Sequence, residues 1–142
     1  MEFRVTGCKT ADIKKFPAIV KGAAKKRSGK NIAKVYADAA YDSRVNFKLL
    51  DNMGIESAIK VRKGSSTKAR GSPARRREVL LSKKLGYEGW KDIKQYGRRW
   101  LVEIAFSVFK RVLGEELSSR KFSAQKTEAA FKVLLYNKFM TV

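Results

Sequence analysis

Histidine is absent from this sequence of 142 residues, and Cys8 is its single cysteine. One thiol cannot form a disulfide within the chain, and without histidine no zinc site of the zinc-finger type can form. A bound metal would therefore need carboxylate ligands, which favours magnesium or manganese. Because the chain has only 13 acidic residues, each acid in an apolar setting is a candidate ligand.

Long apolar runs are missing as well, so no segment is expected to cross a bilayer. No signal peptide opens the sequence, and we expect a cytoplasmic protein. Cations, in contrast, are abundant: 33 lysines and arginines give a net charge of +20, far beyond what solubility requires. A polyanion is the expected partner. Nucleic acid fits best, because no strongly amphipathic helix flanked by lysines suggests a membrane surface.

The length fits one compact domain. In the first half, short β-rich runs alternate with amphipathic stretches of helical length, a β-α-β-α-β succession that favours right-handed crossovers. Asp42 or Ser43 can cap the second helix, and Gly54 can end it. We expect an α/β fold, a mixed sheet with flanking helices. The predicted strands are residues 2–6, 33–37 and 55–61, and the predicted helices are residues 17–26, 43–53, a long apolar helix ended by Gly114, and 124–139.

A basic insertion is predicted at about residues 62–95, with short helices near 74–84 and 88–95. Its cations suit contact with DNA phosphates, and a solvated loop is the alternative. Trp90 is open to either a core or a base-stacking role. The predicted DNA-binding residues are Lys63, Lys68, Arg70, Arg75, Arg76, Arg77, Lys83 and Lys84.

Four polar residues interrupt the long apolar helix. At helical spacing Tyr96, Arg99, Glu103 and Lys110 share one narrow face. Apolar residues occupy most of the remaining surface of the helix, and we expect Trp100 to be part of the core. A carboxylate beside two cations stays ionised, which suits a metal ligand or a salt-bridged structural residue. An ordinary i,i+4 pair of Arg99 with Glu103 on a solvated strip is an equal alternative.

A second candidate acid, Asp38, follows the predicted strand at residues 33–37. Functional groups of α/β sheets gather at the carboxyl ends of strands. A turn or a helix cap is the alternative for Asp38, but Asp42 and Ser43 fill the cap role better. Asp38 therefore needs another explanation.

These residues carry a family resemblance. Tyr96, two residues, Arg99, three residues, Glu103, six residues and Lys110 resemble the Y-R-E-K signature of insertion-sequence transposases with a DDE catalytic triad. Residues 37–43, Ala-Asp-Ala-Ala-Tyr-Asp-Ser, resemble the segment that supplies the second Asp of the same family. The two motifs occur in the expected order.

The resemblance implies a ribonuclease-H-like fold in which three acids bind two divalent ions, Mg²⁺ or Mn²⁺, for DNA cleavage and strand transfer. It makes Asp38 the second acid and Glu103 the third, both as catalytic metal ligands. Tyr96, Arg99 and Lys110 would support the DNA or the acidic cluster. The implied partner is the DNA of transposon ends, and the implied location is the nucleoid.

One part of the family pattern is not found. The first Asp should lie on a strand upstream of residues 2–7, and Asp12 is better explained as a cap than as a substitute. We therefore expect residues 1–142 to be a single partial catalytic domain, truncated at its N-terminal strands and inactive alone. A homo-oligomer or a complementing N-terminal fragment could complete it. The alternatives are an intact nuclease that recruits its missing acid from elsewhere and a non-enzymatic basic nucleic-acid-binding protein.

Overall fold

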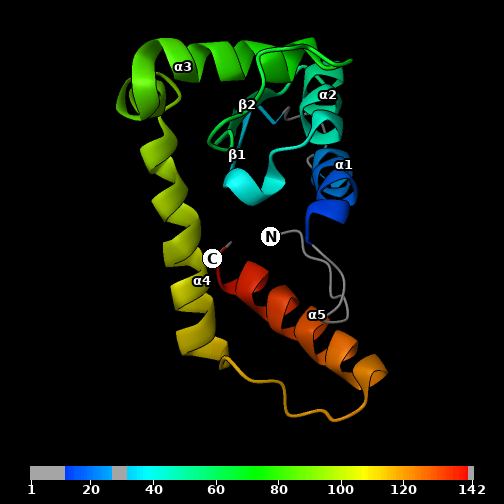
Figure 1. Cartoon of the computed structure of the whole chain (residues 1–142). Helices are drawn as coiled ribbons and strands as arrows, with labels where there is room; N and C mark the ends of the chain where they lie inside the picture. Colours follow the sequence, from blue (N-terminus) through cyan, green and yellow to red (C-terminus); the bar gives the residue numbers. More distant parts are fainter. Residues whose placement is uncertain (1–11, 27–31, 141–142) are drawn as a thin grey trace. The chain divides into compact units, whose positions relative to one another are not determined.

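The computed structural model describes residues 12–26 and 32–140. Among these, the residues up to Arg99 form one compact unit and those from Trp100 form another. We call them the N-terminal unit and the C-terminal unit and describe each by itself. The N-terminal unit contains η1 (Asp12–Lys14), α1 (Phe16–Lys26), β1 (Lys34–Ala37), η2 (Ala39–Tyr41), α2 (Arg44–Asn52), β2 (Glu56–Ile59), α3 (Pro73–Ile93) and η3 (Tyr96–Arg99), and the C-terminal unit contains α4 (Trp100–Leu113) and α5 (Phe122–Phe139) (Figure 1).

The two strands pair in parallel, with Ala37 of β1 opposite Ile59 of β2. Helix α2 connects them. It begins at Ser43, whose hydroxyl accepts a hydrogen bond from the amide of Asn46 at 3.1 Å. It is followed by Gly54 with φ +63°, a conformation that glycine adopts without a steric penalty. The predicted order of strand, helix and strand is confirmed here, while the strand expected at residues 2–6 lies outside the described residues.

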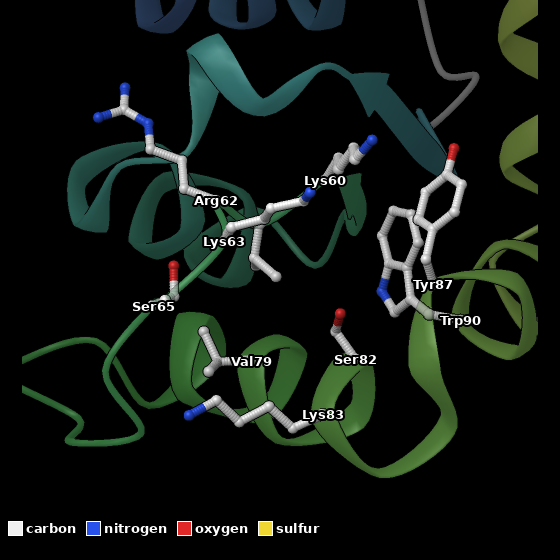
Figure 2. A pocket seen from close by; sticks show the side chains of 11 residues that line it. Lys60, Arg62, Lys63, Ser65, Val79, Ser82, Lys83, Tyr87 and Trp90 are labelled. Atoms are coloured by element: carbon white, nitrogen blue, oxygen red, sulfur yellow. The ribbon is translucent and has the colours of Figure 1, made fainter.

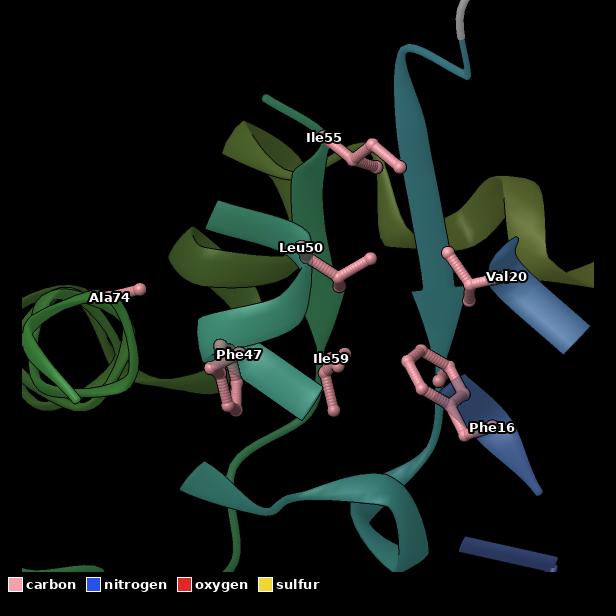
Figure 3. Packing of buried hydrophobic residues seen from close by; sticks show 8 residues of the cluster. Phe16, Val20, Phe47, Leu50, Ile55, Ile59 and Ala74 are labelled. Carbon is pink, nitrogen blue, oxygen red and sulfur yellow. The ribbon is translucent and has the colours of Figure 1, made fainter. Parts of the chain in front are cut away.

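One apolar cluster fixes the sheet against α1 and α2 (Figure 3). Phe47 and Leu50 of α2 and Ile59 of β2 have no exposed surface, and Phe16 and Val20 of α1 close the cluster. Burying each such side chain contributes roughly 1.5–3 kcal/mol. The ends of β1 and β2 are thereby held in a defined place.

The predicted basic insertion is mostly helical. Helix α3 consists of two segments joined at Gly86, which has φ 70° and ψ 179°, and these segments correspond to the two short helices expected from the sequence. A second apolar cluster, Ala58, Trp90 and Tyr96, joins the second segment to β2 and η3. Trp90 is only 1% exposed, so it serves the core, and the loop alternative applies only to the residues before Pro73.

The predicted long apolar helix is two elements, which is a correction. Tyr96 and Arg99 lie in the 3₁₀ helix η3, whereas Glu103 and Lys110 lie in α4. Because the helical phase is broken between them, the single narrow face expected for the four residues is wrong. α4 begins at Trp100, which is also the first residue after the N-terminal unit.

The expected burial of this helix is also wrong. α4 contains no buried residue, and Trp100, predicted as core, is 53% exposed. Apolar side chains of α4 are exposed on several of its sides. Among the described residues of its unit, α5 contacts α4 through Phe109 and Tyr136, whose ring centroids are 5.6 Å apart. Gly114, with φ +78°, ends α4 as predicted. No helix of the described residues is long and apolar enough to span a membrane.

Candidate active site

Asp38 is exposed and lies directly after β1, at the carboxyl end of the parallel pair. Its side-chain Oδ1 accepts a hydrogen bond from the amide of Ala40 at 2.9 Å, which caps the short helix η2. The helix cap considered as the alternative for Asp38 is thus observed, although the helix that it caps is η2 and not α2. The hydrogen bond that Asp38 accepts from the described residues is made by Oδ1 and not by Oδ2.

The peptide before Asp38 is fixed from two directions. The carbonyl oxygen of Ala37 accepts hydrogen bonds from the amide of Lys60 at 3.1 Å and from the hydroxyl of Tyr96 at 3.2 Å. Tyr96 itself is buried, with its ring 5.1 Å from that of Trp90. The guanidinium of Arg99 lies 5.9 Å from the Tyr96 ring. Tyr96 therefore lies beside the strand end that carries Asp38, and Arg99 lies near Tyr96.

The peptides after Asp38 are held by Arg62. Its guanidinium donates to the carbonyl oxygens of Ala39 at 3.1 Å and Ala40 at 3.5 Å. Sequence reasoning missed Arg62 and Lys60. Both follow β2 in the structure, at the sheet edge where functional groups gather. Arg62 comes directly after the strand predicted at residues 55–61, and that position was the available signal.

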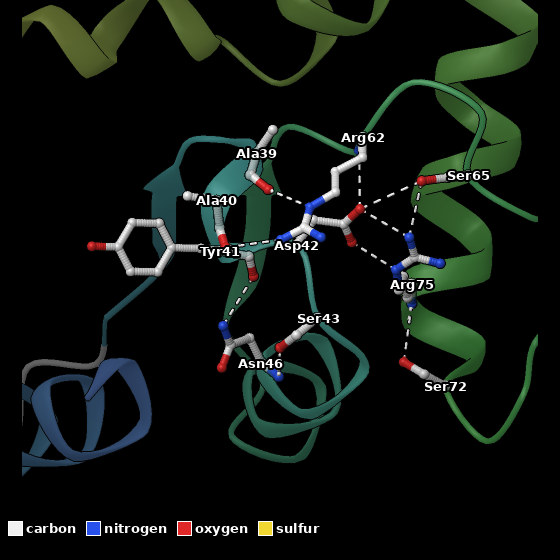
Figure 4. Close-up of polar contacts among 10 residues, drawn as sticks. All are labelled: Ala39, Ala40, Tyr41, Asp42, Ser43, Asn46, Arg62, Ser65, Ser72 and Arg75. Atoms are coloured by element: carbon white, nitrogen blue, oxygen red, sulfur yellow. Dashed lines mark hydrogen bonds and ion pairs between the residues drawn. The ribbon is translucent and has the colours of Figure 1, made fainter. Parts of the chain in front are cut away.

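Asp42 closes this segment with a buried ion pair (Figure 4). Its carboxylate accepts from Arg75 at 2.6 and 2.8 Å and from the amide of Arg62 at 3.0 Å. Burial alone would raise the pKa of Asp42, but the hydrogen bonds from Arg75 and Arg62 outweigh it, and the pKa lies below its usual value. Asp42 is thus an anchor of the fold and not the helix cap proposed for it; Ser43 alone caps α2.

A basic pocket of 310 Å³ lies between the loop that follows β2 and α3 (Figure 2). Lys60 begins that loop, and its ammonium is 4.2 Å from the ring centroid of Tyr87. The described residues that line the pocket include no carboxylate. Two of the predicted DNA-binding residues, Lys63 and Lys83, line it. Since Lys60 is bonded to Ala37, this basic pocket and Asp38 belong to the same edge of the sheet.

The other predicted DNA-binding residues are dispersed. Arg76 donates to the carbonyl oxygen of Thr67 at 3.0 Å, and Arg77 pairs with Asp51 at 2.6 Å. Lys84 is exposed on α3. The remaining three, Lys68, Arg70 and Arg75, line a second hollow that also contains Asp42.

The other two signature residues belong to the C-terminal unit. Glu103 is exposed in the first turn of α4, and Lys110 lies in its last turn, ion-paired with Glu115. Within the described residues no three acids, cysteines or histidines gather into a metal-binding group. The carboxylate chemistry of Asp38 fits a hard divalent cation, but the described residues supply only part of the ligand set that such an ion needs.

Comparison with known families decides the class of protein. A family model described as the transposase DDE domain matches residues 1–138. The chain belongs to this transposase family. No solved structure matches it. Transposase DDE domains generally use divalent metal ions and act on DNA, so the family accounts for the excess of cations, and the alternative of a non-enzymatic basic protein is not favoured.

Proposed function

We propose that this chain supplies the second and third acids of a ribonuclease-H-like DDE transposase of the Y-R-E-K group, which cuts and joins the DNA ends of an insertion sequence. Asp38 and Glu103 are those acids. The observation that carries the proposal is the fixed position of Asp38: Tyr96 holds the peptide before it and Arg62 holds the peptides after it. A carboxylate that serves only as a surface cap needs no such support.

The metal would be Mg²⁺ or Mn²⁺, held by Asp38 and Glu103. When bound, such ions activate a water or a 3′-hydroxyl and stabilise the leaving oxygen of an in-line phosphoryl transfer. The carboxylate of Asp38 would meet the ion in a fixed orientation, because its Oδ1 accepts a hydrogen bond from the Ala40 amide. Tyr96 and Arg99 act as positioning residues, and Lys110 supports the DNA.

A DDE triad consists of three acids, and only two acids of this chain, Asp38 and Glu103, are assigned to it. We propose that another polypeptide segment supplies the missing acid, either an N-terminal fragment or a second copy of the chain, and that the chain alone does not cut DNA. The basic residues of the insertion then hold the substrate without performing chemistry, and the protein associates with the nucleoid.

The test is a cleavage and strand-transfer assay with the DNA that flanks the reading frame, in Mg²⁺ or Mn²⁺. We expect no cleavage by the purified chain, and metal-dependent cleavage after addition of the translated upstream segment. Asp38→Asn and Glu103→Gln should each abolish it. Glu116→Gln, an exposed acid of the same C-terminal unit, is the matched control and should leave cleavage unchanged.

Two results would contradict the proposal in different ways. Metal-dependent cleavage by the chain alone, lost in Glu103→Gln, would favour an intact nuclease. Restored cleavage that survives both acid substitutions would show that Asp38 and Glu103 are not the metal ligands.

A further inference from the structure

A second hollow, of 380 Å³, lies between the start of α2 and the loop that precedes α3. Its lining is polar: Ser43 and Ser66 bring hydroxyl groups, and Asp42 is the acid among the described residues that line it. None of the described residues that line the hollow is aromatic, whereas Tyr87 and Trp90 line the basic pocket described above. The cations that line it are Arg44, Lys68, Arg70 and Arg75.

The charges in this hollow do not balance. The Asp42 carboxylate forms an ion pair with Arg75 and accepts two hydrogen bonds from its guanidinium. For Arg44, Lys68 and Arg70 no carboxylate of the described residues lies within ion-pairing distance. Three like charges around one cavity repel each other unless an anion joins them.

The backbone of the hollow is strained at one of these cations. Arg70 has φ +44°, in the left-handed region that residues with a Cβ rarely adopt. The guanidinium of Arg44 donates to the carbonyl oxygen of Arg70 at 3.2 Å, which ties the turn to the start of α2. Glycine would relieve the strain but remove the charge. Strain held at a charged residue is typical of a functional position.

The hollow also lies at the N-terminal end of α2, a helix of nine residues. Backbone amides and the helix dipole there favour a negative group. We propose that the hollow binds one phosphodiester group of the DNA backbone. Arginine and lysine side chains with hydroxyls are the usual partners of phosphate oxygens, and the absence of an aromatic lining argues against a base.

This inference rests on the proposed function in that the phosphate belongs to the transposase substrate. It adds a specific contact. Asp42, in the wall of the hollow, belongs to the same segment as Asp38. Figure 4 shows Asp42 with Ala39, Ala40 and Tyr41 of this segment. A phosphate bound here therefore fixes the DNA strand to the segment that carries the proposed catalytic acid.

The test compares Arg70→Gly with Arg70→Lys in the full chain, by DNA binding at several salt concentrations. EDTA is present, so the outcome does not depend on catalysis. Arg70→Gly should lower the slope of log K against log salt by about one, and the affinity at 0.1 M salt by about tenfold. Arg70→Lys should keep most of the slope. Because glycine relaxes the backbone, Arg70→Gly should keep or raise the melting temperature.

Lys48→Ala, which removes a charge from an exposed position of α2, is the control and should change the slope by less than Arg70→Gly does. Equal slopes for wild type and Arg70→Gly would overturn the proposal. Inorganic phosphate serves as a second probe, followed through the NMR signals of the arginine side chains. If phosphate binds but Arg70→Gly leaves DNA binding intact, the hollow takes a free phosphate and the DNA assignment is wrong.

The two proposals fail separately. A changed salt slope in Arg70→Gly supports the phosphate site even if Asp38→Asn has no effect on cleavage. Loss of cleavage in Asp38→Asn, with an unchanged slope in Arg70→Gly, supports the catalytic assignment and overturns the phosphate site.

Discussion

The hydroxyl of Tyr96 donates a hydrogen bond to the carbonyl oxygen of Ala37 at 3.2 Å, and Ala37 is the residue directly before Asp38. Tyr96, the first residue of the proposed Y-R-E-K motif, thus contacts Ala37, which lies 59 positions earlier in the sequence. Ala37 ends the strand that leads to Asp38, the proposed second acid. Tyr96 and Ala37 are both buried. The motif residue acts here through the backbone, by fixing a peptide, and it is a positioning residue in the proposed site.

Tyr96→Phe should separate this contact from the packing of the ring. The ring keeps its place against Trp90, while the lost hydrogen bond should lower the free energy of unfolding by about 1 kcal/mol. Urea unfolding measures this change. When the translated upstream segment has been added, metal-dependent cleavage should fall more than DNA binding does. The reason is that the substitution displaces Asp38 without removing a cation.

Tyr87→Phe is the matched control. Tyr87 is 42% exposed, and its hydroxyl makes no hydrogen bond to the described residues, so a change of no more than a few tenths of a kcal/mol is expected. Equal effects of the two substitutions on stability and on cleavage would show that the bond to Ala37 has no special role.

Local signals predicted the centre of the N-terminal unit well. Ser43 caps α2 and Gly54 follows its end, as expected from residue preferences that act within one helical turn. The break between η3 and α4, at Arg99 and Trp100, was missed because helical phase was assumed to continue. Gly97 lies in η3, and a glycine inside the expected helix was a signal for a break.

Long-range pairs could not be predicted in the same way. The sequence offers Asp42 as one of two candidate helix caps, but its partner Arg75 lies 33 residues away, and no local pattern contains that information. Arg75 was correspondingly assigned to DNA. The assignments of Asp38 and Glu103 came from a motif, and they stay predictions because the two residues belong to different units.

Gly86→Ala should destabilise the N-terminal unit. Gly86 joins the two segments of α3 with φ 70° and ψ 179°, a region that is open almost only to glycine. An added Cβ meets no atom within 4 Å, so the cost is conformational, roughly 1–3 kcal/mol. Thermal or urea unfolding measures it. Gly97→Ala, also without atoms within 4 Å of the new Cβ, should be tolerated; a similar loss there would argue against the backbone explanation.

Acid should weaken the N-terminal unit through Asp42. The pKa of this carboxyl is lower in the folded chain than in the unfolded one, so its contribution to stability is present above the unfolded pKa, about 4. It is lost as the pH falls through the folded pKa. Urea unfolding between pH 7 and pH 3 should show this loss in the wild type.

Asp42→Asn isolates that contribution, because it removes the titrating group while keeping its shape. The variant should be less stable at pH 7 by about 3 kcal/mol, since Arg75 loses its buried partner, and the difference from the wild type should shrink toward pH 3. Glu56 and Glu128 also have lowered pKa values, so both proteins keep a shared acid sensitivity. A difference that stays constant with pH would contradict the role of Asp42.

Arg75 and Arg76 are neighbours that the sequence assigned to the same task, and the structure separates them. Arg75 is paired with Asp42, whose side chain is 0% exposed, whereas Arg76 is exposed. Arg75→Ala leaves a buried carboxylate without its partner and should cost roughly 3–5 kcal/mol of stability. Arg76→Ala should cost less than about 0.5 kcal/mol.

DNA binding should separate the two arginines in the opposite way. If Arg76 contacts a phosphate, Arg76→Ala lowers the salt slope of binding by about one at nearly unchanged stability. Arg75→Lys keeps a charge opposite Asp42 but loses the two-pronged bond, so its stability should fall while the salt slope stays close to that of the wild type. The reverse outcome, a stable Arg75→Ala with a reduced slope, would show that Arg75 contacts DNA and that the pair with Asp42 does not anchor the fold.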